Sequence, residues 1–247
     1  MERIVYDRMA ELADVHWWYV ARRQILVDLI RREILPPSKA RILEIGCGTG
    51  HNLLALREFG LVDGLEIDPA ARALAAERLG QPIAAAPLPQ LEGIERQAYD
   101  LVAALDVIEH VEDDTAAIAA IAARLRPGGK LLMTVPAHAW MWSSHDVANH
   151  HQRRYSKAAL RRLLEESPLE IEKLGYFNSL LFPLAVAARM AGKVRHNDDS
   201  DDKLPPKPVN AAFRAIFALE RYAVGRFPLP PGLSLFAIAS ARSPSRG

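Results

Sequence analysis

The sequence has a single cysteine, Cys47, among its 247 residues. One thiol excludes a disulfide framework, and it excludes a zinc site built from several cysteines. A lone cysteine suits a reducing compartment, so we expect a cytoplasmic location. The sequence also lacks the apolar stretch of an N-terminal signal peptide, because Arg3, Asp7, Arg8 and Glu11 interrupt it.

The sequence also lacks a large excess of charge of either sign and a long apolar run. The formal net charge is +1, so no global field attracts the chain to nucleic acid or to an anionic bilayer. No apolar run approaches the ~20 residues of a membrane-spanning helix. Hydrophobic residues make up 50% of the chain, which is enough to bury one sizeable core and an appendage.

The most informative stretch that is present is Arg41–Gly50, with the sequence Arg-Ile-Leu-Glu-Ile-Gly-Cys-Gly-Thr-Gly. Its first half predicts a short buried strand, and the residues after it predict a helix. Glycines stand between the two at Gly46, Gly48 and Gly50. Because glycine has no Cβ atom and a helix N-terminus has unpaired N–H groups, this arrangement predicts a binding site for a nucleotide-type ligand.

Strands and helices alternate along the rest of the chain, which predicts a parallel sheet with helices on both faces. Ligands of such sheets bind at the carboxyl ends of the strands, where Glu66, Asp106 and Pro136 fall. Glu66 follows the glycines by about 20 residues, the separation at which a carboxylate can bind ribose hydroxyls. The further strands are expected at Leu61–Ile67, Gln81–Ala86, Tyr99–Leu105, Lys130–Val135, Glu170–Phe177 and Ser234–Ser240.

Two kinds of nucleotide ligand compete for this site. A dinucleotide site needs Gly-x-Gly-x-x-Gly, and its last glycine position is His51 in this chain. Glu44, just before the glycines, would repel a pyrophosphate but suits a ligand with a cationic amino group. An NAD-dependent oxidoreductase is therefore the less favoured interpretation.

The glycine stretch resembles motif I of the class I S-adenosylmethionine-dependent methyltransferases. The resemblance covers roughly residues 40 to 177, in the right order and spacing. It implies a Rossmann-like fold with a seven-stranded, mostly parallel sheet whose last strand is antiparallel. The other matching segments are Gly64–Pro69, Tyr99–Val102, Asp106–Val111 and Leu125–Met133.

The resemblance implies a set of cofactor contacts. The glycines would pass the methionine part, Glu44 would lie near its amino group, and Glu66 would bind both ribose hydroxyls. Where the family often has an acidic residue for the adenine amino group, this chain has Ala84–Leu88 instead. The implied cofactor-binding residues are Glu44, Gly46, Cys47, Gly48, Gly50, Glu66, Ile67 (on adenine) and Asp106 (beside the methionine part).

The flanks resemble a narrower bacterial subgroup of that family. They carry His16-Trp17-Trp18 near the start and His145-Asp-x-x-x-x-His151-x-Arg-Arg-Tyr155 after the fifth strand. Members of this subgroup look like small-molecule or glycan-pathway methyltransferases. We expect an N-terminal helical lid at residues 1–38, a cofactor-binding core at 39–178, a helical insertion at 179–232, and a final strand and tail of the core at 233–247.

The long loop Pro136–Tyr155 is the expected source of acceptor chemistry. A hydroxyl or ammonium acceptor must lose a proton, and histidine is suited to take it. We expect His145, Asp146 and His151 to be catalytic; alternatively, His145-Asp146 is only a turn. His110 is expected to hydrogen-bond the loop after its strand.

Acceptor contacts are expected from the same loop and from the N-terminal segment. Arg153 and Arg154 could bind a carboxylate or phosphate, or they could pair with Glu165 and Glu166. All four tryptophans fall in two short stretches, which suggests an aromatic roof over the acceptor; at least one would instead dock on the core. The expected substrate-binding residues are Trp17, Trp18, Trp140, Trp142, Arg153, Arg154 and Tyr155.

The sequence predicts transfer of a methyl group to O or N of a small-molecule, glycan-pathway or lipid-linked acceptor. The alternative function is that of a catalytically silent S-adenosylmethionine-binding subunit.

We expect no metal, although Asp106, Glu109 and His110 resemble a Mg²⁺-holding cluster of ubiquinone-pathway O-methyltransferases. The apolar helix Leu180–Met190 is expected to pack on the sheet edge; its alternatives are a pocket cover, a dimer face or a peripheral membrane contact. The protein would be a monomer or a homodimer.

Overall fold

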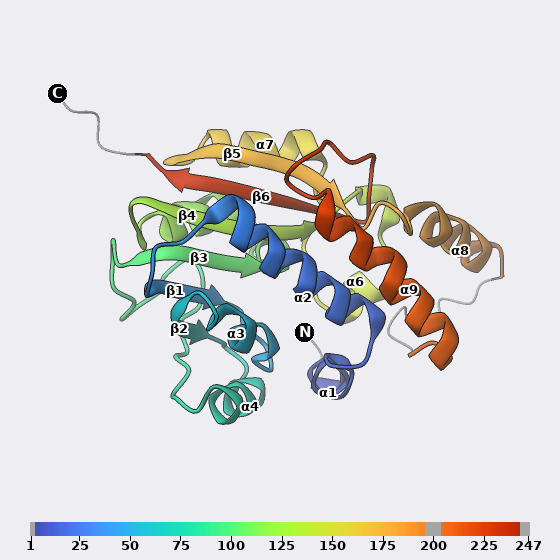
Figure 1. The fold of residues 1–247 in the computed structure, drawn as a ribbon, viewed down its shortest axis with the longest axis horizontal. Helices are drawn as coiled ribbons and strands as arrows, with labels where there is room; N and C mark the ends of the chain where they lie inside the picture. The colour runs from blue at the N-terminus through green and yellow to red at the C-terminus, as the bar shows by residue number, and fades with distance from the viewer. Residues whose placement is uncertain (1–2, 196–203, 243–247) are drawn as a thin grey trace.

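A six-stranded mixed sheet forms the centre of the protein (Figure 1). The structure is a computed structural model that describes residues 3–195 and 204–242. The strand order is β2-β1-β3-β4-β6-β5; β6 is antiparallel to both of its neighbours, and the other pairings are parallel. The strands are β1 (Ala40–Ile45), β2 (Gly60–Leu65), β3 (Tyr99–Leu105), β4 (Leu125–Pro136), β5 (Leu169–Phe177) and β6 (Ser234–Ala241).

Helices cover both faces of this sheet. Helix α4 shows how the sequence sets its ends: Asp68 accepts hydrogen bonds from the N–H groups of Ala70 and Ala71, and Gly80 follows the last turn with a positive φ angle. The helices are α1 (Arg3–Leu12), α2 (Trp17–Leu29), α3 (His51–Leu56), α4 (Pro69–Leu79), α5 (Asp114–Ala122), α6 (Ser144–Ala148), α7 (Lys157–Glu165), α8 (Phe182–Arg195) and α9 (Lys207–Leu219). Shorter turns are η1 (Ile30–Ile34, a π-helix), η2 (Ile108–His110), η3 (Ala139–Met141) and η4 (Glu220–Tyr222).

The core forms two layers because successive residues of each buried strand point to opposite faces. In β1, Ile42 packs with α2, α3 and α9, whereas Leu43 packs with α5 and α7. Leu101 and Val102 divide in the same way in β3. A sheet buried on both faces explains why its strands are nearly continuous apolar runs.

One predicted strand is wrong, and the sheet therefore has six strands instead of seven. Within Gln81–Ala86, only Ala84 pairs with the sheet, through a parallel bridge to Leu65 at the end of β2. Its N–H donates to Gly64 and its carbonyl accepts from Glu66. Prolines at 82, 87 and 89 leave this stretch without the backbone N–H groups that a longer ladder needs.

The other predicted strands are present with shifted ends, and the N-terminal segment contains two helices, α1 and α2. Trp17 and Trp18 lie in the first turn of α2, where the side chain of His16 accepts a hydrogen bond from the Trp18 N–H. Helix α2 crosses the sheet and packs against α9 (Figure 1). The acidic, proline-bearing segment 197–208 is described only from residue 204 onward.

The predicted loop Pro136–Tyr155 is only partly irregular. It contains the turn η3 and the short helix α6, which Ser143 and Asp146 cap reciprocally. Within the residues that the structure describes, no helix combines the length and apolar character needed to cross a bilayer.

Candidate active site at the carboxyl edge of the sheet

The bend between β1 and α3 leaves no room for side chains at its three glycine positions. Gly46, Gly48 and Gly50 have φ angles of 64°, 55° and 84°, which glycine adopts without steric cost. A Cβ atom at Gly50 would lie 2.8 Å from the Cα atom of Ala75, and one at Gly46 would lie 2.7 Å from Cγ2 of Val107. The predicted Gly-x-Gly-x-Gly spacing therefore matches a bend that bulkier residues could not form.

Glu66, at the end of β2, is tied to this bend. Its carboxylate accepts hydrogen bonds from the Gly48 N–H at 2.8 Å and from the Asp68 N–H at 2.9 Å. Glu66 is 4% exposed. A carboxylate has about four lone-pair positions, so two N–H donors leave it able to accept hydrogen bonds from hydroxyl groups as well.

A cavity of about 260 Å³ adjoins Glu66. Ile67 and Leu88 contribute to one part of its wall, and Val107 and His110 contribute to another. The segment 86–88, where a family acidic residue is missing, also lines it with apolar side chains. A mostly apolar cavity with the Glu66 carboxylate in its wall suits the flat ring and the sugar of a nucleoside.

Glu44 and Cys47 flank the same bend and are buried. Burial raises the pKa of Glu44 to about 8, although a hydrogen bond from Asn52 and the charge of Arg22 act in the opposite direction. The Asn52 amide donates to Oε1 at 3.0 Å, whereas Oε2 has no hydrogen-bond partner. Burial also raises the pKa of the Cys47 thiol, so this cysteine is a packing residue of the bend.

Asp106 is held by partners that the sequence did not indicate. It follows β3 with a φ angle of 59°, and its carboxylate lies 2.7 Å from a guanidinium nitrogen of Arg22. The Thr134 hydroxyl donates to Asp106 at 3.0 Å, and Arg22 donates to that hydroxyl at 2.8 Å. The Arg22 guanidinium also lies over the ring of Trp18, 5.0 Å from its centre. Helix α2 is thus joined to the carboxyl ends of β3 and β4.

Helix α1 approaches the glycine bend and Glu66 from the N-terminal segment. The Tyr6 hydroxyl donates to Glu66 at 3.4 Å. A Cβ atom at Gly48 would lie 2.9 Å from Sδ of Met9. The predicted ribose-binding carboxylate thus has a hydroxyl partner within the chain itself.

Asp146 organises the loop between β4 and α7. Its buried carboxylate faces Nδ1 of His151 at 2.8 Å and binds Arg154 through two nitrogens at 2.7 and 2.9 Å. The Ser143 N–H and hydroxyl donate to it at 2.8 and 3.2 Å. Burial alone would raise the pKa of Asp146, but hydrogen bonds from His151 and Arg154 outweigh burial and hold this pKa below its usual range.

The predicted catalytic residues therefore lie close to one another. The contacts among them differ from the predicted ones. The ring centres of His145 and His151 are 6.1 Å apart, and the Asn149 amide nitrogen lies 3.3 Å from Nε2 of His145. Asp146 contacts His151, five residues away, instead of the adjacent His145. Asp146 and His151 thus form the oriented pair. His145 and Asp146 are consecutive residues of the short helix α6, which corresponds to the alternative of a turn.

Arg153 and Arg154, the predicted anion-binding residues, form ion pairs with carboxylates of the chain itself. Arg153 lies 2.8 Å from Asp114, and the Tyr155 hydroxyl donates to the same carboxylate at 2.8 Å. Arg154 is bound to Asp146 as described above. The alternative pairing with Glu165 and Glu166 is wrong, because these carboxylates lie nearest to Arg161 and Arg162 of their own helix. In the structure, Arg153, Arg154 and Tyr155 hold the loop in place.

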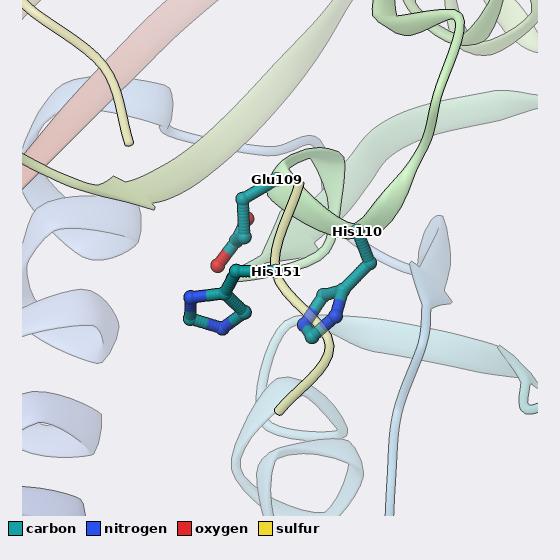
Figure 2. A group of neighbouring side chains, drawn as sticks. All are labelled: Glu109, His110 and His151. Carbon is teal, nitrogen blue, oxygen red and sulfur yellow. The ribbon is translucent and has the colours of Figure 1, made fainter. Parts of the chain in front are cut away.

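Three groups that could hold a metal ion meet beside this loop. Figure 2 shows Glu109 and His110 on the turn after β3, with His151 from the loop beside them. One ligand atom from each lies within 4.8 Å of the others. Both carboxylate oxygens of Glu109 are buried without a hydrogen-bond partner. Asp106, which the sequence pattern grouped with Glu109 and His110, is not part of this set because it faces Arg22.

The charge states of this cluster follow from its burial. Burial raises the pKa of Glu109, and the nearby charge of Asp106 adds to the effect. Burial, followed by the charge of His151, lowers the pKa of His110 to about 4. At neutral pH, Glu109 is thus held toward its protonated form, and His110 is a neutral imidazole. His110 also lines the nucleoside-sized cavity, which its sequence-based interpretation did not include.

The four tryptophans do not form one group. Trp17 packs edge-on against Phe213 and Phe217 of α9, with ring centres 5.6 and 5.8 Å apart. Trp17 therefore docks on the core, as the alternative interpretation predicts. Trp140 and Trp142 are 55% and 36% exposed at the end of β4.

No sequence motif points to His138. This residue follows β4 with a φ angle of 61°, which is uncommon for a residue other than glycine. Its ring stacks on Tyr176 and Phe182, with ring centres 5.4 and 5.1 Å apart. No sequence pattern indicates the contact of Arg22 with Asp106. The one local signal for Arg22 is Trp18, which lies one helical turn before it.

Comparisons with known proteins agree with this geometry. A family profile described as a methyltransferase domain matches residues 18–174. The chain is 30% identical over 141 residues to a ubiquinone biosynthesis O-methyltransferase of Xanthomonas axonopodis pv. citri. It is 28% identical over 177 residues to a protein of Mycolicibacterium smegmatis named a probable S-adenosylmethionine-dependent methyltransferase. These matches cover 52% and 68% of this chain, and they span about three-fifths of the relatives' length (59% and 65%).

Solved structures share the fold at lower identity. A chain of the complex between the Haloferax volcanii Trm112 methyltransferase activator and a methyltransferase has a TM-score of 0.65 at 19% identity, covering 99% of this chain and 97% of that one. The Haemonchus contortus phosphoethanolamine N-methyltransferase 2, solved with S-adenosyl-L-methionine, has a TM-score of 0.55 at 18% identity, covering 90% and 52%. Identities of this size show a common fold and nothing more specific.

Proposed function

This chain belongs to the methyltransferase domain family, and we propose that it transfers a methyl group from S-adenosylmethionine to O or N of a small-molecule, glycan-pathway or lipid-linked acceptor. One relative is named for methylation of oxygen, which supports an oxygen acceptor. The His16-Trp17-Trp18 flank and the loop residues 145–155 resemble a small-molecule or glycan-pathway subgroup, which supports the acceptor classes.

The residues at the carboxyl edge fit the cofactor. Glu66 would accept hydrogen bonds from the ribose hydroxyls, and Ile67 would pack on the adenine ring in the adjoining cavity. Glu44, with one buried oxygen still unpaired, would pair with the cationic amino group. The bend at Gly46, Cys47, Gly48 and Gly50 would pass the methionine part, with Asp106 beside it. The observation that carries the proposal is the hydrogen bond from the Gly48 N–H that joins Glu66 to this bend at the edge of the cavity.

The cofactor supplies a methyl group bonded to a positively charged sulfur atom. The protein must hold the acceptor in line with that bond, exclude water and remove a proton from the acceptor. We assign proton removal to His151. Asp146 contacts its Nδ1 and thereby fixes the ring, so that Nε2 is the nitrogen that faces the acceptor. His145 lies beside this pair, and Trp18, Trp140 and Trp142 border the acceptor.

The test is turnover with labelled S-adenosylmethionine and pools of phenols, amines, glycan intermediates and extracted lipids. We expect S-adenosylhomocysteine to form with at least one pool. His151→Gln should lower kcat by about 10²–10⁴-fold, which is the usual contribution of a general base. His150→Gln is the matched control, because His150 is the exposed neighbour in the same loop, and it should leave kcat unchanged.

The other outcomes separate the alternatives. Binding of S-adenosylmethionine without turnover in any pool would identify the chain as a silent binding subunit, and absence of binding would contradict the proposal. Turnover that EDTA abolishes and a divalent metal restores would assign Glu109, His110 and His151 to a metal site instead of a proton-removing histidine. We expect turnover to survive EDTA.

A further inference from the structure

The helical insertion between β5 and β6 exposes much apolar surface. In α8, none of residues 182–190 is buried, and in α9 only Phe217 is. Large apolar side chains on these two helices and just before α9 are 38–65% exposed. Five of these side chains, which we call the apolar end, are Leu184, Met190, Leu204, Val209 and Ile216. Apolar surface exposed by one part of a protein is typical of an interaction site.

The apolar end lies at the same end of the molecule as the candidate active site. In Figure 1, α8 and α9 occupy one end of the long axis, toward which the arrowheads of β1, β3 and β4 point. The glycine bend follows β1, and the loop with His151 follows β4. Phe182, at the start of α8, stacks on His138 of that loop with ring centres 5.1 Å apart. A partner on the apolar end would therefore face the mouth of the site.

The described part of the insertion itself exposes charges of one sign. Lys207 and Arg214 of α9 are exposed, and Arg189 of α8 donates to the Met141 carbonyl. In residues 179–195 and 204–232, Glu220 is the one acidic residue. It is 2% exposed and accepts hydrogen bonds from the backbone N–H groups of residues 178–180. The aspartates at 198, 199, 201 and 202 lie outside the described residues.

We propose that the apolar end docks on the surface of a lipid bilayer that contains anionic lipids. Apolar side chains such as Leu184 and Met190 enter the boundary between head groups and acyl chains, and Lys207 and Arg214 contact lipid phosphates. The protein rests on the membrane without crossing it. A two-fold contact with a second copy fits less well, because it would bring the same basic surface against itself.

The experiment is co-sedimentation of the full chain with vesicles at about 0.15 M salt, without cofactor or acceptor. Vesicles of phosphatidylcholine with 30 mol % phosphatidylglycerol are compared with pure phosphatidylcholine. We expect binding to the anionic vesicles, with a partition coefficient at least about tenfold above that for the neutral ones. The double variant Lys207→Glu/Arg214→Glu should lower the partition coefficient for the anionic vesicles by at least about 30-fold, because each cation near an anionic surface contributes about a fivefold factor.

Matched variants make the assignment specific. Leu184→Glu/Met190→Glu should lower the partition coefficient by at least about tenfold, whereas Leu61→Glu should not, since Leu61 is 73% exposed at the opposite edge of the sheet. Arg161→Glu/Arg162→Glu on α7 is the charge control. The proposal is overturned if anionic vesicles do not bind the chain or if both apolar-end variants bind as well as the unchanged protein. Light scattering that shows a dimer abolished by Leu184→Glu/Met190→Glu would also overturn it. Because no methyl donor is present, the result is independent of the proposed reaction.

Discussion

The two sides of the carboxyl edge are built by different means. Beside β1 and β2, the structure presents backbone N–H groups, a side-chain-free bend and one carboxylate, Glu66. Beside β3 and β4, charged side chains bind one another: Asp146 binds Arg154, and Asp106 binds Arg22. The side that we propose for the nucleoside, called the nucleoside side, is thus formed by the path of the backbone. The side that we propose for the acceptor, called the acceptor side, is formed by buried ion pairs.

This difference separates the consequences of mutation. A buried ion pair is costly to break, because the remaining charge keeps its burial without its partner. A carboxylate held by backbone N–H groups can change with less effect on the fold, because the bend is formed by glycines. We therefore expect substitutions on the acceptor side to lower stability, and those on the nucleoside side to lower ligand affinity.

The largest expected effect is at Asp146. Asp146→Asn should lower the free energy of unfolding by about 3–5 kcal/mol, because Arg154 would stay buried without a counter-charge. Urea unfolding followed by fluorescence measures this change. The control is Glu165→Gln, which removes an exposed pair with Arg161 and should change stability by less than about 0.5 kcal/mol. A loss below about 1 kcal/mol for Asp146→Asn would show that the acceptor side does not depend on its ion pair.

The next effect is on ligand affinity. Glu66→Gln should raise the Kd for S-adenosylmethionine by about 10–100-fold, which corresponds to the loss of charged hydrogen bonds to ribose. Stability should fall less than in Asp146→Asn. Asp63→Asn is the matched control, because Asp63 lies on the same strand and binds Arg41 and Tyr99 away from the cavity. Isothermal titration that gives equal affinities for Glu66→Gln and the unchanged protein would end the ribose assignment.

The same difference explains what the sequence could predict. The glycine bend, Glu66 and the order of the strands were predictable because their signals are local: glycine spacing, alternation of apolar residues and turn residues. The missing strand at Gln81–Ala86 fails for a local reason too, since three prolines near it limit backbone pairing. The apolar residues of this stretch predict a strand, whereas its prolines do not allow one to form.

The acceptor side was harder because its partners lie far apart in the sequence. Nothing near Asp106 indicates that Arg22, 84 positions earlier, will bind it. His145 and Asp146 are adjacent in sequence, yet helix α6 directs Asp146 to His151. Trp17 and Trp18 are adjacent too, but they lie on different sides of helix α2. Trp17 packs against α9, and Trp18 lies against the guanidinium group of Arg22. Side-chain pairing of this kind depends on tertiary packing, which the order of residues does not reveal.

The finest test of the comparison concerns Glu44, a carboxyl group of the nucleoside side that burial holds in its protonated form. The pKa of Glu44 is about 8 in the folded protein because of burial, whereas it is about 4.3 in an unfolded chain. Between these values the folded protein binds more protons than the unfolded chain, so stability should fall as pH rises from about 4.3 to 8. Glu44→Gln should flatten this slope.

Pairing of Glu44 with the cationic amino group of S-adenosylmethionine would reverse this protonation. Binding at pH 6.5 should then release up to about one proton, because the carboxylate ionises to meet the ammonium group. Isothermal titration in two buffers of different ionisation enthalpy measures this release, and Glu44→Gln should abolish it. Equal enthalpies in both buffers would mean that Glu44 stays protonated in the complex. The nucleoside side would then bind its ligand through Glu66 and the backbone, without the second carboxylate.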